Sequence, residues 1–480
     1  MWQPVLMING FIIFVIGIMM FIPSFALYYY TGTPDYIFIQ SGIASMFFGG
    51  LLFLANYGKI EKISIIQGYL ITVFCWFILP FVCSLPLYNN GSIHTFTNAL
   101  FEATSGITAT GATILNNTEG ELKSVLLWRA ILNGLGGIGI VIFAVALMPF
   151  LGIGGMHLFN KENSDTEDKF LPKVRYIAKD IIITYVLLNI VCALLLNMAG
   201  MNKFDAITHA MSTIGTAGFS TKNNSISFFD NYLIELIIGV FMIIGALPIT
   251  YLILAFKRRT ISSITSNAQV NTFLKLLAFY IIALTVFYAN YANIEYTKAF
   301  RYVSFNTISA ITTTGLASSN FVAWGSWSFI VFLIFYMHGG CTGSTTGSIK
   351  IFRWQVISAF FKKNSIKSLS PNQIAVMKIG DKIINENIVS SVFVLVLGFI
   401  FSIIFLCLVI CLTGVDFATS IGAVVACITN SGIGLTEAIG PNGSFAEFSN
   451  FVKYILSFAM ILGRLEVVSV IVLLTKIKLP

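Results

Sequence analysis

The chain has 480 residues, of which 57% are hydrophobic and only 10% are charged, with a formal net charge of +8. A soluble globular protein carries about 25% charged residues, so this composition excludes a cytosolic enzyme, a disordered chain and a secreted disulfide scaffold. The seven cysteines fall in or beside apolar segments and their number is odd, so no disulfide framework is implied. We therefore expect a membrane protein with many spans.

Apolar runs of about 18 to 25 residues are long enough to cross a bilayer as helices. The sequence contains ten such runs, at residues 5–30, 36–56, 66–88, 125–151, 178–200, 231–256, 273–292, 327–354, 389–413 and 450–475. The first run lacks the basic start and the small-residue cleavage site of a signal peptide, so we interpret it as a transmembrane span.

The distribution of Lys and Arg predicts the orientation of the chain. If the N-terminus is inside, 20 of the 28 Lys and Arg residues fall on the inner face and 7 on the outer face, and Arg464 lies within a span. This bias predicts that both termini are cytoplasmic and that the spans lie in a lipid bilayer. The positive charge therefore reports topology, and we expect no nucleic-acid partner.

Four segments between consecutive spans are too short and too polar to cross a bilayer, and they align with one another. They are NALFEATSGITATG (98–111), DAITHAMSTIGTAG (205–218), YVSFNTISAITTTG (302–315) and TSIGAVVACITNSG (419–432). Each ends on glycine, each has isoleucine four residues earlier, and the sixth residue before the glycine is serine in all but the last. Ordinary loops have no reason to share these columns, so we interpret the segments as an internal fourfold repeat.

Each repeat consists of an apolar span, a half-length amphipathic segment, a strip of small residues and a second span. Non-helical backbone at membrane depth is tolerated only where it is buried or lines a water-filled cavity. Four strips around one axis would form such a cavity, and their backbone carbonyls could replace the water shell of a cation. The half-helix before each strip would direct its partly negative C-terminal end toward the same point. The alternative, ordinary re-entrant or outer loops, leaves the shared columns unexplained.

Glycines also recur at mid-depth in the second span of each repeat, at Gly136, Gly245, Gly339 and Gly463. In three repeats we interpret this glycine as a close-packing or bending point. In the third repeat, HGGCTGSTTGS (338–348) would form a poor helix. We therefore expect an unwound segment here, just inside the ion filter that the four strips would form, and we expect this segment to act as a gate. The alternative is a packing face of small residues.

Arg464 and Glu466 lie near the middle of the last span, where a charge is costly and by default marks a functional site. Two residues apart on a helix, the two side chains point to different faces, so we expect them not to pair with each other. We predict that Arg464 meets the unwound segment around Gly343–Gly347 as a barrier or latch. The alternative is a purely structural charge that a neighbouring helix neutralises.

The chain resembles the TrkH/TrkG subunits of the bacterial Trk potassium-uptake system, in the superfamily that includes KtrB. The resemblance rests on the four strips and on residues 128–159 (WRAILNGLGGIGIVIFAVALMPFLGIGGMHLF), 339–350 (GGCTGSTTGSIK) and 461–474 (ILGRLEVVSVIVLL). It implies an all-α polytopic membrane protein with four membrane-pore-membrane repeats around a central potassium pore and two extra N-terminal transmembrane helices. The corresponding boundaries are 1–60 for the extension and 61–160, 161–260, 261–365 and 366–480 for the repeats.

The resemblance also implies roles for individual residues. The potassium filter falls on Thr108, Ala109, Thr110 and Gly111, on Gly215, Thr216, Ala217 and Gly218, on Thr312, Thr313, Thr314 and Gly315, and on Thr429, Asn430, Ser431 and Gly432. The gate falls on Gly339, Gly340, Gly343, Ser344, Thr345, Thr346, Gly347 and Arg464. At position 348 this chain has serine where the family more often has glycine.

The family further implies a homodimer in the bacterial plasma membrane and a cytoplasmic nucleotide-binding regulatory subunit resembling TrkA. K⁺ is the transported ion, and no organic cofactor is expected on this chain. The basic segment 362–382 is a predicted docking site for the regulatory subunit, although a solvated positive loop explains it equally well.

Two other functions stay open at this stage. One is a sodium-dependent or weakly selective K⁺/Na⁺ transporter of KtrB type, because each strip has only one shared glycine. The other is an integral-membrane enzyme, which would need clustered acidic or histidine residues at one membrane face, and the sequence offers none. GLGGIG (134–139) matches a dinucleotide-binding pattern, but it lies within a span with no strand before it.

Overall fold

The computed structural model describes residues 2–58, 64–146, 170–260, 262–373, 376–380 and 382–466. Its elements are α1 (Gln3–Met19), α2 (Phe21–Thr31), α3 (Tyr36–Ala55), α4 (Ile65–Asn89), α5 (Phe96–Ile107), α6 (Lys123–Ala146), α9 (Phe170–Met198), α10 (Lys203–Ile214), η2 (Ser225–Phe229), α11 (Tyr232–Ala246), α12 (Ile249–Arg258), α13 (Ser262–Thr265), α14 (Ala268–Ala292), α15 (Tyr296–Ile311), η3 (Phe321–Trp324), α16 (Ser326–Met337), α17 (Ile351–Leu369), β1 (Lys378–Ile379), β2 (Lys382–Ile383), α18 (Glu386–Cys411), α19 (Phe417–Ile428) and α20 (Asn450–Arg464).

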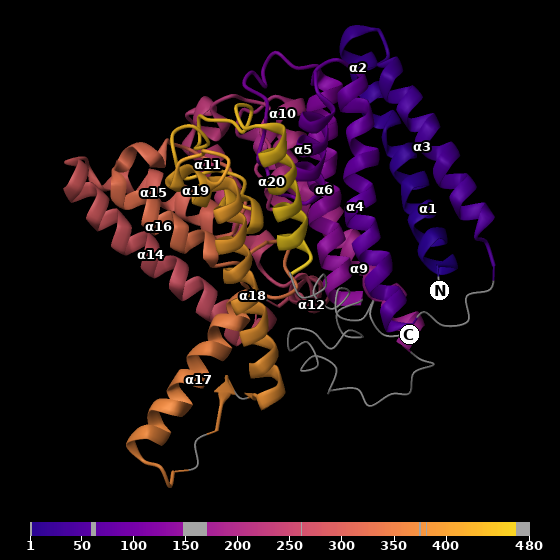
Figure 1. The fold of residues 1–480 in the computed structure, drawn as a ribbon. Coiled ribbons are helices and arrows are strands. Elements are labelled where there is room, and N and C mark those ends of the chain that lie inside the picture. The colour runs from indigo at the N-terminus through magenta and orange to yellow at the C-terminus, as the bar shows by residue number, and fades with distance from the viewer. Residues whose placement is uncertain are drawn as a thin grey trace.

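Helices of two lengths alternate along most of the chain. After α1–α3, a long helix is followed by a short one and then by a further helix, in the sets α4–α5–α6, α9–α10–α11, α14–α15–α16 and α18–α19–α20. Figure 1 shows α5, α10 and α19 within the body of the protein, with α1 and α3 along one edge and α14 along the other. One continuous hydrophobic cluster runs through these sets from Ile13 to Leu465.

The N-terminal helices α1 and α3 pack closely because glycines line their contact. A Cβ atom on Gly49 of α3 would lie 2.6 Å from the backbone nitrogen of Phe14, and one on Gly17 of α1 would lie 2.8 Å from the carbonyl oxygen of Gly42. Small residues at such a contact allow two membrane helices to approach backbone to backbone. These two helices therefore form a unit at the edge of the protein (Figure 1).

Six described helices are long and apolar enough to cross a membrane, and the bent pair α11–α12 makes a seventh if it counts as one span. Three predicted spans are not in this group. The spans 125–151 and 450–475 continue into residues 147–169 and 467–480, which lie outside the described part of the chain. The span 327–354 is interrupted between α16 and α17, as the run of small residues predicts.

Two spans are broken within the bilayer region. Helices α11 and α12 meet at an angle of 102°. Pro248 precedes α12, and proline both lacks a backbone N–H and disfavours helical conformation in the residue before it. The break comprises Leu247 and Pro248 and so lies just after Gly245, where the sequence analysis places a packing or bending point. The second break is the segment 338–350, here called the 338–350 loop, which connects α16 to α17.

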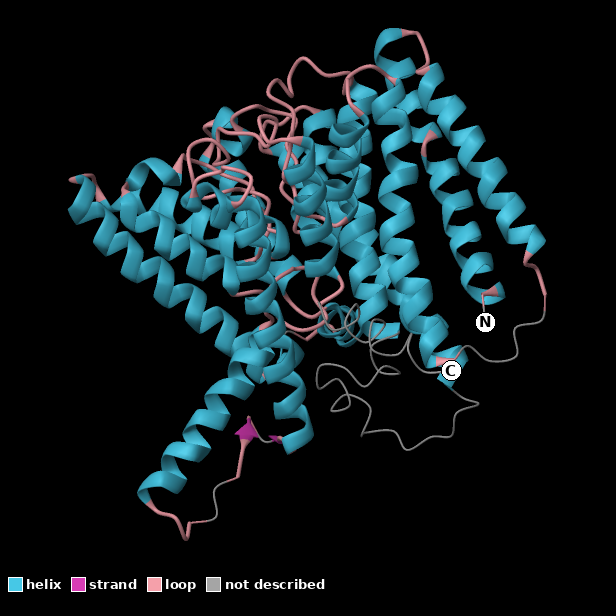
Figure 2. Ribbon diagram, in the orientation of Figure 1, coloured by secondary structure: helices cyan, strands magenta, loops and turns pink. Residues whose placement is uncertain are grey.

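Helix α17 extends beyond the predicted span. The apolar run ends at residue 354, whereas α17 continues to Leu369 and through the expected repeat boundary at residue 365. A short antiparallel pairing of Lys378 with Ile383 follows before α18. Figures 1 and 2 show α17 and this hairpin projecting from the body of the protein. We refer to α17 together with β1 and β2 as the projecting arm.

Candidate functional site

Four short helices, α5, α10, α15 and α19, each end at the isoleucine that directly precedes one of the four strips. Thr95, Asn202 and Asp416 cap three of them by accepting a hydrogen bond from a backbone N–H in the first turn. Capping residues of this kind satisfy donors that a helix start leaves free. The sequence therefore fixes the starts of three of these helices, and the C-terminal ends of all four lead directly into the strips.

The four strips share one backbone conformation. Their second residues all have positive φ: 52° at Ala109, 47° at Thr216, 53° at Thr313 and 57° at Asn430. This left-handed conformation ends the preceding helix, and it is uncommon for residues other than glycine. The same conformation at four aligned positions shows that the sequence repeat corresponds to a structural repeat.

The N–H of each third residue returns to the helix that precedes its strip. It donates to the carbonyl of the residue six positions before the glycine, from Thr110 to Ser105 (2.8 Å), Ala217 to Ser212 (2.8 Å), Thr314 to Ser309 (2.9 Å) and Ser431 to Ala426 (3.0 Å). In a trans peptide group the C=O points opposite to the N–H. The carbonyls of the second residues therefore point away from their helices.

The strips form a closed ring in chain order. A Cβ atom on Gly111 would lie 2.3 Å from the nitrogen of Gly218, and one on Gly218 would lie 2.7 Å from the oxygen of Gly315. The ring closes through Gly315, whose Cβ would lie 2.1 Å from the oxygen of Ser431, and through Gly432, whose Cβ would lie 2.1 Å from that of Thr110. No real Cβ fits at such distances, so glycine is required at the fourth position by close backbone approach.

Hydroxyl groups of three strips are bonded in the same way. The first and third residues of these strips pair through their side-chain oxygens, Thr108 with Thr110 (2.7 Å), Thr312 with Thr314 (2.7 Å) and Thr429 with Ser431 (3.0 Å). Each first-position hydroxyl also donates to the carbonyl four residues earlier in its helix. The second strip lacks this pair because Gly215 and Ala217 occupy these positions.

Asn430, which makes the fourth strip more polar, bonds through its amide both to its own helix, at the Cys427 carbonyl, and to other parts of the chain. Its Nδ2 donates to the Thr110 hydroxyl at 2.9 Å and to the carbonyl oxygen of Met460 at 3.0 Å. The amide therefore joins the fourth strip to the first strip and to α20, and it closes the ring at the one junction between the chain's last and first repeats.

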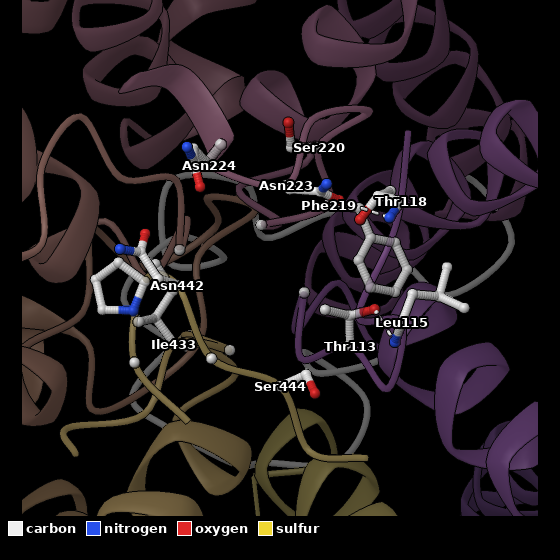
Figure 3. Close-up of a pocket in the computed structure, with 18 of the residues that line it drawn as sticks. Thr113, Leu115, Thr118, Phe219, Ser220, Asn223, Asn224, Ile433, Asn442 and Ser444 are labelled. Atoms are coloured by element: carbon white, nitrogen blue, oxygen red, sulfur yellow. Dashed lines mark hydrogen bonds between the residues drawn. The ribbon is translucent and has the colours of Figure 1, made fainter. Parts of the chain in front are cut away.

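A cavity of about 260 Å³ opens on one side of the ring. All four strip glycines line it, together with the polar segments that follow the strips, and Figure 3 shows Thr113, Ser220, Asn224 and Ser444 around it. Most of its lining groups are amides, hydroxyls and backbone, while Arg129 and Lys222 also contribute. The cavity therefore gives polar access to the glycine end of the strips.

The 338–350 loop packs against the bend between α11 and α12. The N–H of Cys341 donates to the carbonyl of Ala246 at 2.9 Å, and the N–H of Ile249 donates to the carbonyl of Gly343 at 3.1 Å. Gly343 has a φ of +82° and Ser348 one of +57°, so the loop uses two left-handed residues. The broken ends of the two spans thus satisfy each other's backbone groups at membrane depth.

The loop also contacts three of the four strips, at their ends remote from the cavity. The Thr345 hydroxyl lies 3.1 Å from the Thr216 hydroxyl, and the N–H of Gly347 donates to the Thr313 hydroxyl at 2.8 Å. A Cβ on Gly347 would lie 2.2 Å from the carbonyl oxygen of Thr429. The loop therefore lies directly against the ring, and only glycine fits at its closest approach.

Arg464 links this loop to the first repeat. Its side chain is buried, and its guanidinium donates to the carbonyl of Thr345 at 3.1 Å and to that of Gly136 at 2.8 Å. The predicted contact between Arg464 and residues 343–347 is therefore confirmed. Glu466 pairs with Arg353 of α17, so the expectation that Glu466 and Arg464 do not pair is also confirmed.

The mid-span glycines pack against the ends of the short helices. A Cβ on Gly136 would lie 2.2 Å from the carbonyl oxygen of Ile107, one on Gly463 would lie 1.9 Å from that of Ile428, and one on Gly245 would lie 3.2 Å from that of Ile214. The prediction of close packing is confirmed at Gly136 and Gly463, and at Gly245 a bend follows as well. The other expected glycine, Gly339, lies in the 338–350 loop.

Sequence reasoning missed the polar side chains that hold the segments after the strips. Glu102, His209 and Asn306 occupy the same position in their repeats, nine residues before the strip glycine. Each contacts the segment that follows its own strip. The available signal was a polar residue in this column in three of four repeats, although its identity varies.

The fold and this site define a helical membrane protein with four aligned re-entrant strips around one ring. The profile of the TrkH family, described as cation transport proteins, matches residues 35–480. The chain therefore belongs to the TrkH family of Trk potassium uptake transporters.

Individual relatives agree over the full length. The chain is 33% identical to the Trk system potassium uptake protein TrkI of Halomonas elongata, over 99% of this chain and 96% of that protein. It is 32% identical to the Trk system potassium uptake protein TrkG of Escherichia coli strain K12, over 97% and 96%. The crystal structure of the potassium transporter TrkH from Vibrio parahaemolyticus matches with a TM-score of 0.91 and 27% identity, covering 99% of this chain and 98% of that one.

Proposed function

We propose that this chain takes up potassium ions across the bacterial plasma membrane and that the ring of four strips is its selectivity filter. The observation that carries the proposal is the closed ring of Gly111, Gly218, Gly315 and Gly432. The printed names of the relatives as potassium uptake proteins support K⁺ as the transported ion.

The chemistry of the ring suits a dehydrated monovalent cation. The N–H groups of the third residues are bonded to the short helices, so the peptide carbonyls before them are directed away from these helices and toward the ring. Carbonyl oxygens arranged in this way replace the hydration shell of a cation. The partly negative C-terminal ends of α5, α10, α15 and α19 lie at the ring and favour positive charge.

The 338–350 loop serves as the gate in this proposal. It contacts the ring on the side opposite the cavity, so an ion that leaves the filter must displace it or pass beside it. Arg464 holds the loop to Gly136 and places a positive charge on the path. In this proposal, the contacts of the loop with the ring and with Arg464 belong to the closed state of the gate.

The orientation and partners follow from the same proposal. The excess of Lys and Arg on one face supports cytoplasmic termini and a cytoplasmic projecting arm. We propose that the chain works as a homodimer and that a nucleotide-binding subunit resembling TrkA binds at the cytoplasmic face. Lys362 and Lys367 on α17 are exposed and would contact such a subunit, whereas Lys363 pairs with Glu386 of α18.

Rubidium influx into liposomes that contain the purified chain tests the filter. We expect saturable influx in the wild type and none in Gly315→Asp, because a side chain at position 315 meets the Ser431 carbonyl. Gly414→Asp is the matched control: Gly414 also has positive φ, but a Cβ there meets no atom within 4 Å. External sodium in excess should compete weakly, and strong competition would favour a weakly selective K⁺/Na⁺ transporter.

A gate that stays closed without the regulatory partner would also abolish influx. The experiment is therefore repeated with Arg464→Ala, which removes the hydrogen bond between the arginine and the loop. Influx that persists in Gly315→Asp contradicts the filter. Absence of influx in both the wild type and Arg464→Ala contradicts transport through this ring.

A further inference from the structure

In three of the four repeats, the segment that follows the strip is held by the side chain nine positions before the strip glycine. This position is Glu102 in the first repeat, His209 in the second, Asn306 in the third and Ala423 in the fourth. All four lie on the short helices, and all four are buried. Their side chains differ in charge and size, yet the three polar ones bind the same part of their repeats.

Glu102 uses both carboxylate oxygens. One accepts from the Ile114 N–H at 2.9 Å, and the other accepts from the Thr113 hydroxyl at 2.9 Å and from Arg129 Nε at 2.7 Å. Hydrogen bonds with ionised partners are stronger than those between neutral groups. Thr113 and Ile114 lie two and three positions after Gly111, so the carboxylate fixes the segment that directly follows the first strip.

Arg129 extends this support to the second repeat. Its Nη1 donates to the carbonyl of Ser220 at 3.2 Å. His209 lies behind the same residue, with Nε2 2.9 Å from the Ser220 hydroxyl and Nδ1 2.8 Å from the carbonyl of Asp205. Ser220, two positions after Gly218, is thus held through its backbone by one repeat and through its side chain by its own repeat.

Asn306 makes the equivalent contacts in the third repeat. Its Nδ2 lies 3.2 Å and 3.0 Å from the hydroxyls of Ser318 and Ser319, and its Oδ1 accepts from the Ser318 N–H at 3.4 Å. In the fourth repeat Ala423 offers no polar group. There the buried Leu435 packs against the short helix, since a Cβ on Gly422 would lie 3.3 Å from the Leu435 nitrogen.

We propose that Glu102, with Arg129, and the equivalent residues His209 and Asn306 are positioning residues of the filter that set its preference for K⁺ over Na⁺. The inference rests on the proposed function of the ring. These side chains touch no ion, but they fix the outer ends of three strips from behind. A smaller cation requires the carbonyls to move inward, so the support from behind resists its binding.

Ion-dependent thermal unfolding of the full chain in detergent tests this inference, since binding to the native state raises Tm whether or not the gate is open. Titration with KCl and with NaCl gives an apparent affinity ratio. Glu102→Gln preserves shape but places an amide N–H against donors, so we expect the K⁺/Na⁺ ratio to fall about tenfold. Asn306→Ala, which loses neutral bonds only, should lower it about threefold.

Glu235→Gln is the matched control. Glu235 is also buried and paired with an arginine, Arg301 of α15, at 2.7 Å, but the described hydrogen bonds of its carboxylate go to Arg301 and not to the residues directly after a strip glycine. This variant should lower Tm and leave the ion ratio within about twofold of the wild type. If the K⁺/Na⁺ affinity ratio falls as far in Glu235→Gln as in Glu102→Gln, the inference is overturned. The loss of any buried ion pair would then be enough to change the ratio.

The outcomes separate the inference from the filter itself. A wild-type preference for K⁺ that is lost in Gly315→Asp but unchanged in Glu102→Gln and Asn306→Ala overturns the inference and leaves the filter intact. If Glu102→Gln does not fold, the ratio measured for Asn306→Ala decides. If KCl and NaCl raise the Tm of the wild type equally, the result contradicts both a selective filter and the proposed role of the positioning residues.

Discussion

The ring of strips and the 338–350 loop lie against each other, but their hydrogen bonds are distributed differently over the repeats. Each strip is bonded to the short helix of its own repeat, as the Thr110–Ser105 and Thr314–Ser309 bonds illustrate. The loop is bonded to its own repeat at Gln269 and Thr313, and it is also bonded to two other repeats, through Gly245, Ala246 and Thr216 of the second and Arg464 of the fourth. The backbone conformation of each strip is therefore set within one repeat, whereas the position of the loop depends on three.

Under the proposed function, this difference would let one chain combine a fixed filter with a movable gate. Contacts within a repeat link residues that are close in sequence, and the same contact occurs in all four repeats. Contacts between repeats depend on how the repeats are placed relative to one another, so a shift of one repeat changes them. Two-state elements of this kind are what switching mechanisms bias.

The largest effect on stability is expected where α6 packs against the end of α5, directly before the first strip. Gly136→Ala places a methyl group 2.2 Å from the Ile107 carbonyl, between two backbones that cannot separate without opening the first strip. We expect a loss of about 3 kcal/mol in stability, with a lower yield of folded protein and a lower Tm in detergent.

Gly134→Ala, in the same helix, provides the control. A Cβ at Gly134 would lie 3.9 Å from Met211, an ordinary contact, so this variant should be neutral or gain up to about 1 kcal/mol in helix stability. Equal destabilisation by the two variants would show that helix α6 tolerates no change and that the ring contact is not special.

A smaller effect, on flux rather than stability, is expected for the gate. Arg464→Ala removes two hydrogen bonds from a charged group to the Thr345 and Gly136 carbonyls, so the closed loop loses its link to the first repeat. Bonds to charged groups contribute about 1.5–3 kcal/mol, so we expect rubidium influx to rise at least about tenfold.

Lys453→Met controls for the loss of a buried cation. Lys453 lies on the same helix α20 and is bonded to Asn98 and Ala446, away from the loop. Influx in this variant should stay within about twofold of the wild type. Unchanged influx in Arg464→Ala would mean that the arginine is structural and does not control the gate.

Much of the site could be predicted because it is repeated. The strips, their glycines and the packing of Gly136 and Gly463 follow from columns that recur at regular spacing. The contact of Arg464 with the loop follows from the cost of an isolated charge in a span, which leaves few partners other than an unwound backbone.

The remaining features depend on contacts that sequence columns do not record. The position nine residues before each strip glycine contains Glu, His, Asn and Ala, so the repeats share no residue type that would reveal its role. The residues that these side chains contact also lie in segments outside the aligned columns. Helix α17 passes the end of its apolar run because hydropathy predicts the membrane boundary and not the end of a helix. The bend of 102° falls at Pro248 rather than Gly245, since proline removes the N–H that a continuous helix would need.

The most direct test of the central claim is to locate the ion. Crystals of the protein grown in rubidium chloride should show an anomalous rubidium peak on the axis of the ring, within coordinating distance of carbonyl oxygens from all four strips. The Gly315→Asp variant should show none there. Rubidium that binds only in the outer cavity of the wild type, with the ring empty at saturating concentration, would contradict the account.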